Sequence, residues 1–246
     1  MPGVFISKGM SLRIPSISFT IRDDGEIEGA PVVLEVHFDV CPTWIQLAKK
    51  HLSAARRARK ARDSAWTVTD EDKKSKALEA EFEASMQAMM AAAIAWDSAY
   101  ANLKEFVDLP QSIVDQWRKG RTARYSQVSE VVRRAFTLKP KGVKNLRSNL
   151  KEIYRFRDLA VHPSGKIQPA QHHPELDVGV EWRFAYFRAS NAEVAVIAAA
   201  AMLWDLAHNG KPKNERVAEY QGRLASRLQE IFPRGAPKLP TGGKTE

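Results

Sequence analysis

The sequence predicts a mostly helical protein with a small β appendage at its N-terminus. Beyond Pro42, apolar residues recur at the spacing of amphipathic helices over most of the chain. The first 40 residues instead alternate apolar and polar side chains, which is the pattern of β-strands. We expect a β appendage at 1–41 and a helical bundle at 42–232 with a loop or strand insertion at 163–189. The tail at 233–246 is rich in Pro, Gly and Lys, and we expect it to be disordered.

The expected appendage consists of two strands, over residues 12–21 and 32–40, joined through the turn-forming sequence Asp23-Asp24-Gly25. Two strands are marginally stable on their own, so we expect them to pack on helices or to pair with a third strand. The aromatic-rich segment 180–187 is the candidate for that strand. Base stacking is the alternative role for its aromatic side chains.

Two long helices are expected to form the antiparallel spine of the bundle. Thr43 is the expected cap of the first helix, and the second should cover residues 71–107. Ser190 and Glu193 match a capping box that opens a later core helix. The most apolar run of that helix, residues 194–203, is too short to span a bilayer, so we expect a buried helix and no membrane association.

Composition favours a cytoplasmic protein with an anionic partner. The single cysteine, Cys41, excludes an intramolecular disulfide and a cysteine-based zinc site. Histidines and carboxylates lack an obvious metal-ligand spacing, so no metal and no cofactor are expected. The net charge of +9 favours RNA or DNA phosphate as a partner. One basic cluster supplies candidate RNA contacts, although it can equally be a solvated helix face: Arg56, Arg57, Arg59 and Arg62.

The most informative motif runs from Arg157 through Asp158 to His162, at the end of a helix expected over residues 143–161. A histidine can move protons near neutral pH, and an arginine can grip a phosphate with two hydrogen bonds. Arg157 continues the apolar stripe of this helix, so we expect it to lie on the buried face. Pro163 disfavours helical geometry at the residue before it and should end the helix.

Helix geometry does not decide which arginine acts together with His162. Residues five apart diverge by about 140° around an ideal helix, so Arg157 and His162 converge only if His162 swings off the helix end or a second subunit completes the site. Arg155 lies nearly on the same face as His162 and competes for the role. In the structural interpretation, Arg157 pairs with a nearby carboxylate and His162 caps the last carbonyls.

The motif of Arg157, Asp158 and His162 resembles the Arg-polar-x-x-x-His motif of the HEPN superfamily, and the resemblance extends over the surrounding helices, about residues 44–210. It implies a metal-independent endoribonuclease with its site at a homodimer interface. Many such proteins are bacterial toxins or antiviral defence effectors, which implies an antitoxin or defence-system partner. His162 would be the general base or acid, Arg157 would hold the scissile phosphate, and Asp158 would orient either side chain.

Two other hypotheses remain from the sequence. Some HEPN domains are not catalytic, so the alternative is a HEPN-like module that binds RNA or a protein partner. The third is a DNA-binding regulator built on residues 111–136, whose pattern resembles a helix-turn-helix.

Overall fold

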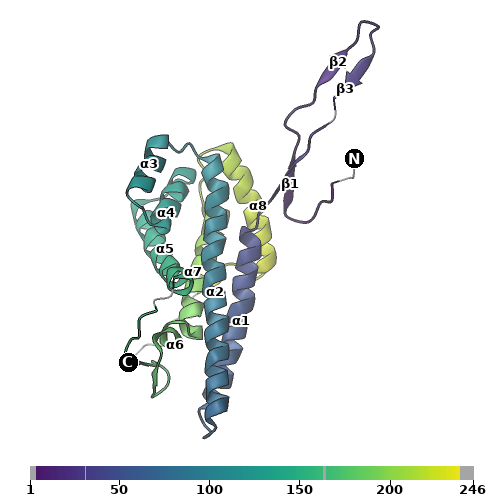
Figure 1. Ribbon diagram of the computed structural model, residues 1–246. Coiled ribbons are helices and arrows are strands. Elements are labelled where there is room, and N and C mark those ends of the chain that lie inside the picture. The colour runs from purple at the N-terminus through teal and green to yellow at the C-terminus, as the bar shows by residue number, and fades with distance from the viewer. Residues whose placement is uncertain (1–3, 31, 163–164, 239–246) are drawn as a thin grey trace. The chain divides into compact units, whose positions relative to one another are not determined.

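The computed structural model describes residues 4–30, 32–162 and 165–238, and the chain divides into two units, Met1–Val40 and Cys41–Glu246. The mostly helical fold class that the sequence predicts is confirmed (Figure 1). Pro163, on which the expected end of the motif helix depends, lies outside the described residues, as do residues 239–246 of the expected tail.

The first unit is one antiparallel hairpin whose ladder has two segments. Its strands are β1 (Met10–Arg13), β2 (Phe19–Ile21), β3 (Ile27–Gly29) and β4 (Glu35–Phe38), and β1 pairs with β4 while β2 pairs with β3. The connection at Asp23-Asp24-Gly25 forms as the sequence predicts. Gly25 has a φ of +82°, and the Asp24 carboxylate accepts a hydrogen bond of 3.0 Å from the Glu26 amide. The left-handed φ explains why glycine stands at this position.

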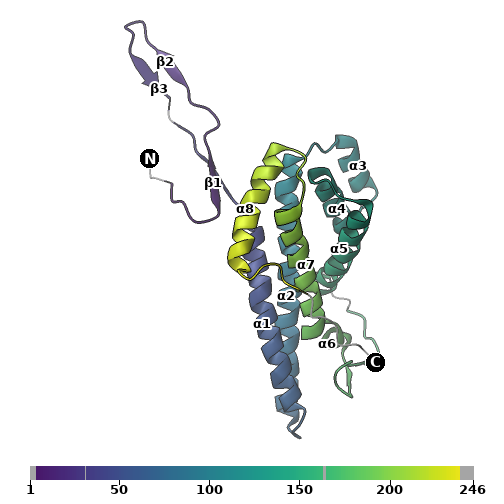
Figure 2. The same cartoon turned by 180° about the vertical axis from the view of Figure 1, so that it is seen from behind.

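The second unit is a helical bundle, and all eight helices of the described residues belong to it (Figures 1 and 2). They are α1 (Cys41–Ala65), α2 (Glu71–Phe106), α3 (Gln111–Lys119), α4 (Arg124–Ala135), α5 (Pro140–Val161), α6 (Trp182–Tyr186), α7 (Ala189–Asn209) and α8 (Glu215–Ile231). Two short strands, β5 (Gln171–His172) and β6 (Gly179–Val180), pair antiparallel between α5 and α6.

The helices α1 and α2 lie side by side and form the expected spine (Figure 1). Small side chains such as Ala88, Ala92 and Ala95 are fully buried on α2, and they allow its neighbours to approach closely around the buried ring of Trp96. The helix α7 packs on α1, α2, α5 and α8, and α4 and α5 pack on the opposite side of α2 from α1 (Figure 2). Within the described residues, α7 is also the one helix long and apolar enough to cross a membrane, a test that core helices pass as well.

The observed first residues of α1 and α7 show that two capping predictions are wrong. The helix α1 begins at Cys41, so Thr43 lies in its first turn rather than at its cap. The helix α7 begins at Ala189, whose amide donates a 2.8 Å hydrogen bond to the Glu81 carboxylate of α2. The capping box of Ser190 and Glu193 is therefore wrong, because a carboxylate far away in the sequence already satisfies the helix start.

The third strand predicted over residues 180–187 is also wrong. The segment forms the short helix α6, whose start is capped by the Glu181 carboxylate through a 2.8 Å hydrogen bond from the Arg183 amide. Trp182 and Tyr186, four residues apart, place their ring centroids 5.7 Å from each other, which is a helical contact. Aromatic residues of the segment then pack against α2, where Phe82 lies 5.2 Å from the ring of Phe184.

Candidate functional site

The motif helix α5 buries one face from Leu146 to Phe156 and is half-exposed at its end. Leu146, Leu150 and Ile153 are buried, as their spacing predicts. Arg157 keeps 26% of its side chain exposed, and Val161 is 44% exposed. The expected buried face is therefore only partly covered at the motif, where Leu159 and Ala160 pack against the core and Val161 is exposed.

Arg157 lies in an ion cluster centred on Asp97 of α2. Its guanidinium is 3.8 Å from the Asp97 carboxylate and lies 5.5 Å from the centre of the Tyr154 ring. The Tyr154 hydroxyl donates a 2.9 Å hydrogen bond to Asp97, and Arg124 approaches the same carboxylate to 3.4 Å. Burial raises the pKa of Tyr154, and the charge of Asp97 acts in the same direction. This pairing with a nearby carboxylate is the one that the structural interpretation of Arg157 predicts.

Asp158 and His162 meet through the backbone. The His162 amide donates a 2.9 Å hydrogen bond to the Asp158 carbonyl, which ends the helix. The Asp158 carboxylate is 61% exposed and lies 3.8 Å from the guanidinium of Arg157. Of the two side chains that Asp158 is predicted to orient, the carboxylate pairs with Arg157, and the described residues show no contact between it and the His162 ring.

The exposed residue His162 lines a pocket of about 280 Å³ between α5, the β5 segment and α6. Arg155 belongs to this pocket and Arg157 does not, which is the divergence that the helix geometry predicts. The lining residues are Arg155, Leu159, His162, Gln168, Gln171, Trp182 and Tyr186. Sequence reasoning missed the two glutamines and the presence of the two rings in the same pocket as His162. The four-residue spacing of Trp182 and Tyr186 was the available signal.

Arg155 is held at the pocket by three contacts. Its Nε lies 2.9 Å from the Glu152 carboxylate, and its guanidinium lies 5.0 Å from the Phe156 ring centre and 5.7 Å from that of Tyr186. The side chain remains 46% exposed, so the cation is oriented but still open to solvent. An imidazole, a guanidinium, two carboxamides and two aromatic rings therefore share one small cavity. This set suits a ligand that combines an anionic group with a flat ring.

A second polar cluster lies buried beside the pocket. Arg62 of α1 is fully buried, and its guanidinium donates to Glu81 at 2.6 Å and to Glu175 at 2.8 Å. Glu175, in the turn between β5 and β6, also accepts hydrogen bonds from Arg188 at 3.2 Å and from Ser190 at 2.8 Å. Burial raises the pKa of Glu175, but the hydrogen bonds from Arg62 and Ser190 outweigh it, so the net pKa lies below its usual value.

This cluster fastens the segment that supplies the pocket with Gln171. His173 follows two residues later and is fully buried, and its Nδ1 accepts a 3.2 Å hydrogen bond from the Glu175 amide. Its Nε2 has no hydrogen-bond partner in the described structure. Burial, together with the charge of Arg62, lowers the pKa of His173 to about 4, so the ring is neutral at neutral pH. The segment is thus anchored by an ion network and a neutral histidine.

The predicted RNA-contacting arginines of α1 separate into different groups. The assignment of Arg62 is wrong, because its guanidinium is buried and its donors already serve carboxylates. Arg56 pairs with Glu193, and Arg59 lies 3.2 Å from Glu175. Arg57 is exposed, and no ion pair involves it in the part of the chain that the structure describes. Of the four, Arg57 is the residue best placed to meet a phosphate.

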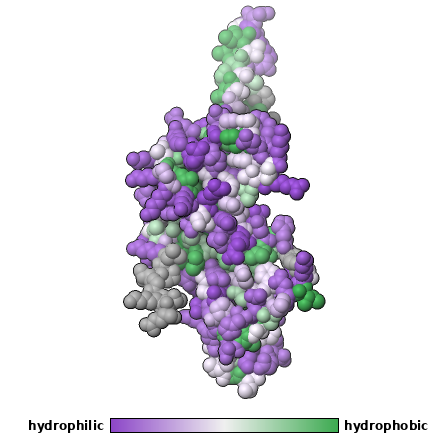
Figure 3. Space-filling model, turned by 90° about the vertical axis from the view of Figure 1, so that its left-hand side faces the viewer, coloured by the Kyte–Doolittle hydropathy of each residue, from purple (hydrophilic) through white to green (hydrophobic). Residues whose placement is uncertain are grey.

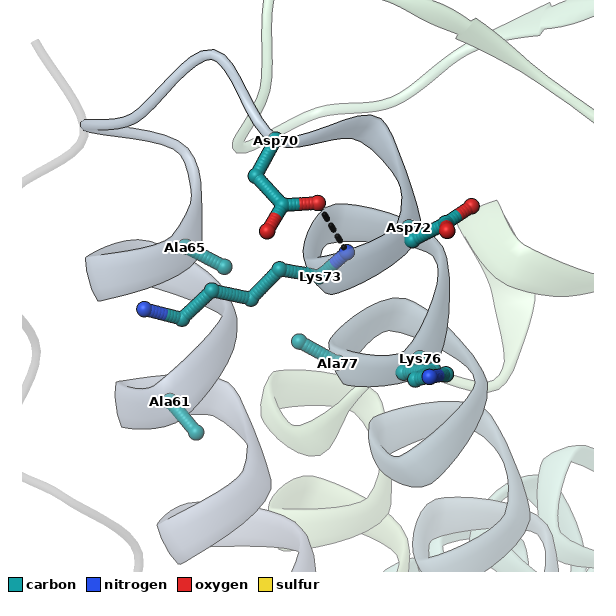
Figure 4. Close-up of a pocket in the computed structure, with 7 residues that line it drawn as sticks. All are labelled: Ala61, Ala65, Asp70, Asp72, Lys73, Lys76 and Ala77. Atoms are coloured by element: carbon teal, nitrogen blue, oxygen red, sulfur yellow. Dashed lines mark hydrogen bonds between the residues drawn. The ribbon is translucent and has the colours of Figure 1, made fainter.

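A larger cavity, of about 570 Å³, lies at the turn between α1 and α2 (Figure 4). Figure 4 shows Asp70 capping α2 through its hydrogen bond to the Lys73 amide, with the Lys73 side chain extending toward α1. Three alanines form much of the remaining wall: Ala61, Ala65 and Ala77. The cavity contains two lysines and two aspartates but no histidine and no aromatic ring, so it offers less for catalysis than the His162 pocket.

Among the described residues, no group of three or more His, Cys, Asp or Glu side chains is placed to hold a metal ion. No protein-family model, curated protein or solved structure matches the chain.

Proposed function

We propose that the helical unit is a metal-independent endoribonuclease whose reaction takes place at the His162 pocket. The observation that supports this most is the presence of His162 and Arg155 in one cavity with Trp182 and Tyr186. A flat base can stack on the rings, the guanidinium can bind a phosphate oxygen, and the imidazole can move a proton. The net charge of +9 favours an anionic substrate of this kind.

The proposed reaction is an internal transesterification of RNA. The 2′-oxygen forms a bond to phosphorus while the bond from phosphorus to the 5′-oxygen breaks. A base removes the proton of the 2′-hydroxyl, and an acid gives a proton to the departing 5′-oxygen. The products carry a 2′,3′-cyclic phosphate and a 5′-hydroxyl. Arg155 stabilises the charge that builds up on the phosphate oxygens in the transition state.

This reaction needs an acid and a base, whereas one copy of the pocket contributes one imidazole. The remaining polar groups are a guanidinium, which stays protonated, two carboxamides and an indole, which do not titrate, and the phenol of Tyr186, a side-chain type that does not ordinarily change its charge between pH 5 and 8. We therefore extend the proposal to a homodimer in which a second His162 completes the pair. In such a composite site, Arg157 of one copy is available to the phosphate bound by the other, which is the role that the HEPN resemblance gives it.

The test is cleavage of labelled single-stranded RNA by the full chain in EDTA. We expect His162→Ala to lose at least ~100-fold in rate, the usual effect of removing a general acid or base. Arg155→Ala should lower the rate, and Arg133→Ala is its matched control. The two arginines are 46% and 47% exposed, and each pairs with a glutamate three residues before it. His208→Ala, on an exposed histidine of α7, controls for His162.

The outcomes show which arginine binds the phosphate and whether the site needs two copies of the chain. A larger loss in Arg157→Ala than in Arg155→Ala would assign the phosphate to Arg157 and the site to two copies. Full activity in His162→Ala, or activity only with added metal, would refute the mechanism. Mixing inactive His162→Ala chains with wild type tests the composite site, because mixed dimers should lose activity out of proportion to the fraction of variant.

The second candidate function is a non-catalytic module that binds RNA or a protein. It is favoured by Arg157, whose guanidinium already lies on Tyr154 and beside Asp97. RNA that binds and remains intact in wild type would support it. A toxin or antiviral role, with a cytoplasmic antitoxin or defence-system partner, follows from the resemblance alone. Growth arrest that depends on His162 after induced expression would test that role.

A further inference from the structure

One stretch of the chain carries the entire excess of positive charge. Residues 111–151, which form α3, α4 and the first half of α5, contain eleven Lys and Arg against two Asp and Glu, a net charge of +9. The other 205 residues contain 27 basic and 27 acidic side chains, so they are neutral overall although the whole chain carries +9. Figure 3, which faces α3, α4 and α5, shows hydrophilic (purple) side chains over much of this side. The attraction for an anionic partner is therefore local to these helices.

The three arginines of α4 in this stretch are already paired with carboxylates. Arg133 and Arg134 both pair with Glu130, at 2.7 and 2.8 Å. Arg124 lies 3.4 Å from the Asp97 carboxylate of α2. A phosphate that approached α4 would compete with these carboxylates for the same guanidinium groups, so α4 offers less to an anion than its charge indicates.

The cations of α5 lie in one exposed row, and most of them have no carboxylate partner. Lys144, Arg147, Lys151 and Arg155 follow one another at steps of three, four and four, so they fall within about 80° around an ideal helix. All four residues are exposed. Among the described residues, the first three form no ion pair, and Arg147 donates a 3.3 Å hydrogen bond to the Ser126 hydroxyl of α4 instead. These four residues are called the α5 row below.

The α5 row leads to the His162 pocket. His162 follows Arg155 after seven residues, which is about two helical turns, and both residues line the same cavity. Leu146, Leu150 and Ile153 lie on the other side of α5 and are buried. Like charges three or four residues apart destabilise a helix, so the row acts against the stability of α5. A bound polyanion would relieve this repulsion.

We propose that the α5 row binds the backbone of a single-stranded RNA whose reacting phosphate lies in the His162 pocket. The proposal rests on the endoribonuclease function, since it takes RNA as the substrate of that pocket. From Lys144 to His162 the helix rises by about 27 Å, which corresponds to about eight phosphates at the ~3.4 Å spacing of a stacked strand. Cations that contact phosphates position a strand without reading its sequence. The row therefore favours a substrate several nucleotides long, with no sequence preference outside the pocket.

Other occupants fit this face less well. A second copy would place the same cations opposite the row and be repelled, so a dimer contact at His162 has to leave the row open. A helix that lies on a membrane exposes an apolar face beside its cations, whereas the apolar face of α5 is buried in the bundle. A DNA strand lacks the 2′-hydroxyl that the proposed reaction needs. An unpaired strand is favoured over a duplex because a free base can stack on Trp182 and Tyr186 in the pocket.

The binding of a 2′-O-methyl RNA of about 12 nucleotides tests the row without cleavage, because the attacking hydroxyl is blocked. The row variant replaces the first three members of the row by glutamine, which keeps the helix propensity high: Lys144→Gln, Arg147→Gln and Lys151→Gln. The control variant replaces three exposed lysines of α1 and α2 that also form no ion pair among the described residues: Lys50→Gln, Lys73→Gln and Lys76→Gln. Each variant loses three positive charges, and circular dichroism should show unchanged helix content in both.

We expect the row variant to bind this RNA at least about tenfold more weakly than wild type in about 0.1 M salt, whereas the control variant binds like wild type. The slope of log affinity against log salt concentration should become shallower by about 2, because each phosphate contact of a single strand contributes about 0.7. An RNA of about four nucleotides can occupy the pocket without reaching the row, so its affinity should be the same in all three proteins.

Three binding results would overturn the proposal. Equal salt slopes in the row variant and wild type would make the row a solvated helix face. An equal loss in the row and control variants would show that overall charge, rather than the row, attracts RNA. No binding of the longer RNA by wild type would leave the row to a different anion.

The row and the endoribonuclease function can fail separately. A chain that binds RNA through the row and cleaves none of it would refute the endoribonuclease function and keep the row. Cleavage of the longer RNA with the same KM in the row and control variants would refute the row and keep the endoribonuclease function. If both hold, the row variant should raise the KM for the longer RNA and leave kcat nearly unchanged, because the row contacts the strand equally before and during the reaction.

Discussion

Removal of the buried guanidinium of Arg62 should destabilise the helical unit severely. The side chain of Arg62 is 1% exposed and that of Glu81 is 2% exposed, so neither charge is screened by water. In Arg62→Met, Glu175 keeps Arg59, Arg188 and Ser190 as partners, whereas Glu81 retains only the Ala189 amide among its described contacts. Breaking a buried pair on one side typically costs about 3–5 kcal/mol. Folded domains are ordinarily stable by about 5–15 kcal/mol. This loss would remove roughly a third to a half of a stability near the middle of that range.

A second substitution should relieve much of this loss. Glu81→Gln removes the uncompensated charge and keeps an oxygen to accept the hydrogen bond from the Ala189 amide, so the start of α7 stays capped. We therefore expect Arg62→Met with Glu81→Gln to be more stable than the sum of the single losses predicts, by about 2–3 kcal/mol. This coupling separates a specific ion pair from general damage to the packing.

Urea unfolding followed by circular dichroism measures all four proteins of the cycle. Arg223→Met is the control, because Arg223 forms an exposed pair with Glu219 at 3.9 Å, and its loss should cost less than about 1 kcal/mol. A loss in Arg62→Met no larger than that of the control would show that the guanidinium is not desolvated. Strictly additive losses in the double variant would refute the coupling to Glu81.

Three further outcomes follow from the site and its surroundings. The pKa of His173 is about 4 in the folded chain against an ordinary 6.5, so below pH 6.5 the unfolded chain binds a proton that the folded chain does not, and stability is lost as the pH falls toward 4. The loss should reach about 3 kcal/mol and be absent from His173→Asn, which keeps an acceptor for the Glu175 amide; equal pH profiles in urea unfolding would contradict it. The raised pKa of Glu81 acts in the opposite direction but is common to both proteins, so it cancels in the difference. Tyr154→Phe, which removes the hydrogen bond to Asp97, should cost about 1 kcal/mol in the same assay, and no change would show that the bond is not formed. Arg57→Ala should reduce the salt dependence of RNA binding by about one phosphate contact, whereas an unchanged slope in a filter-binding titration would make Arg57 a solvated residue.

Periodicity predicts the bundle because its helices bury one stripe each. The long helix expected at 71–107 is observed as Glu71–Phe106, and the motif helix expected to end at Val161 does so. The segment at 180–187 was misassigned because β-propensity measures fit to a half-buried surface rather than a backbone preference. Trp182 and Phe187 are buried instead, and Phe184 packs on Phe82 of α2. Local propensity could not distinguish these two ways of covering an aromatic side chain.

Part of the candidate site was predictable from helix geometry alone. The spacing of Arg155 and His162 places both on one face, and the structure gives both to one pocket. The buried cluster was not predictable, because Arg62, Glu81 and Glu175 come from three separate segments, and only their tertiary packing brings them together. Arg62 looks from the sequence like its neighbour Arg57, yet one is buried and the other is exposed. Charge clusters on helices therefore say little about which members remain available to a ligand.

The positions of the two polar clusters connect stability with the proposed chemistry. The pocket needs Gln171 and the α6 rings beside the end of α5, and those elements belong to a segment with little apolar core of its own. Glu175 ties that segment to α1 and to the start of α7, and the Glu81 bond to Ala189 fixes the same helix start. A pocket assembled on a short irregular segment keeps its geometry only if that segment is held firmly from behind. The buried ions thus serve the pocket by fixing this wall, so their loss should disturb activity as well as stability.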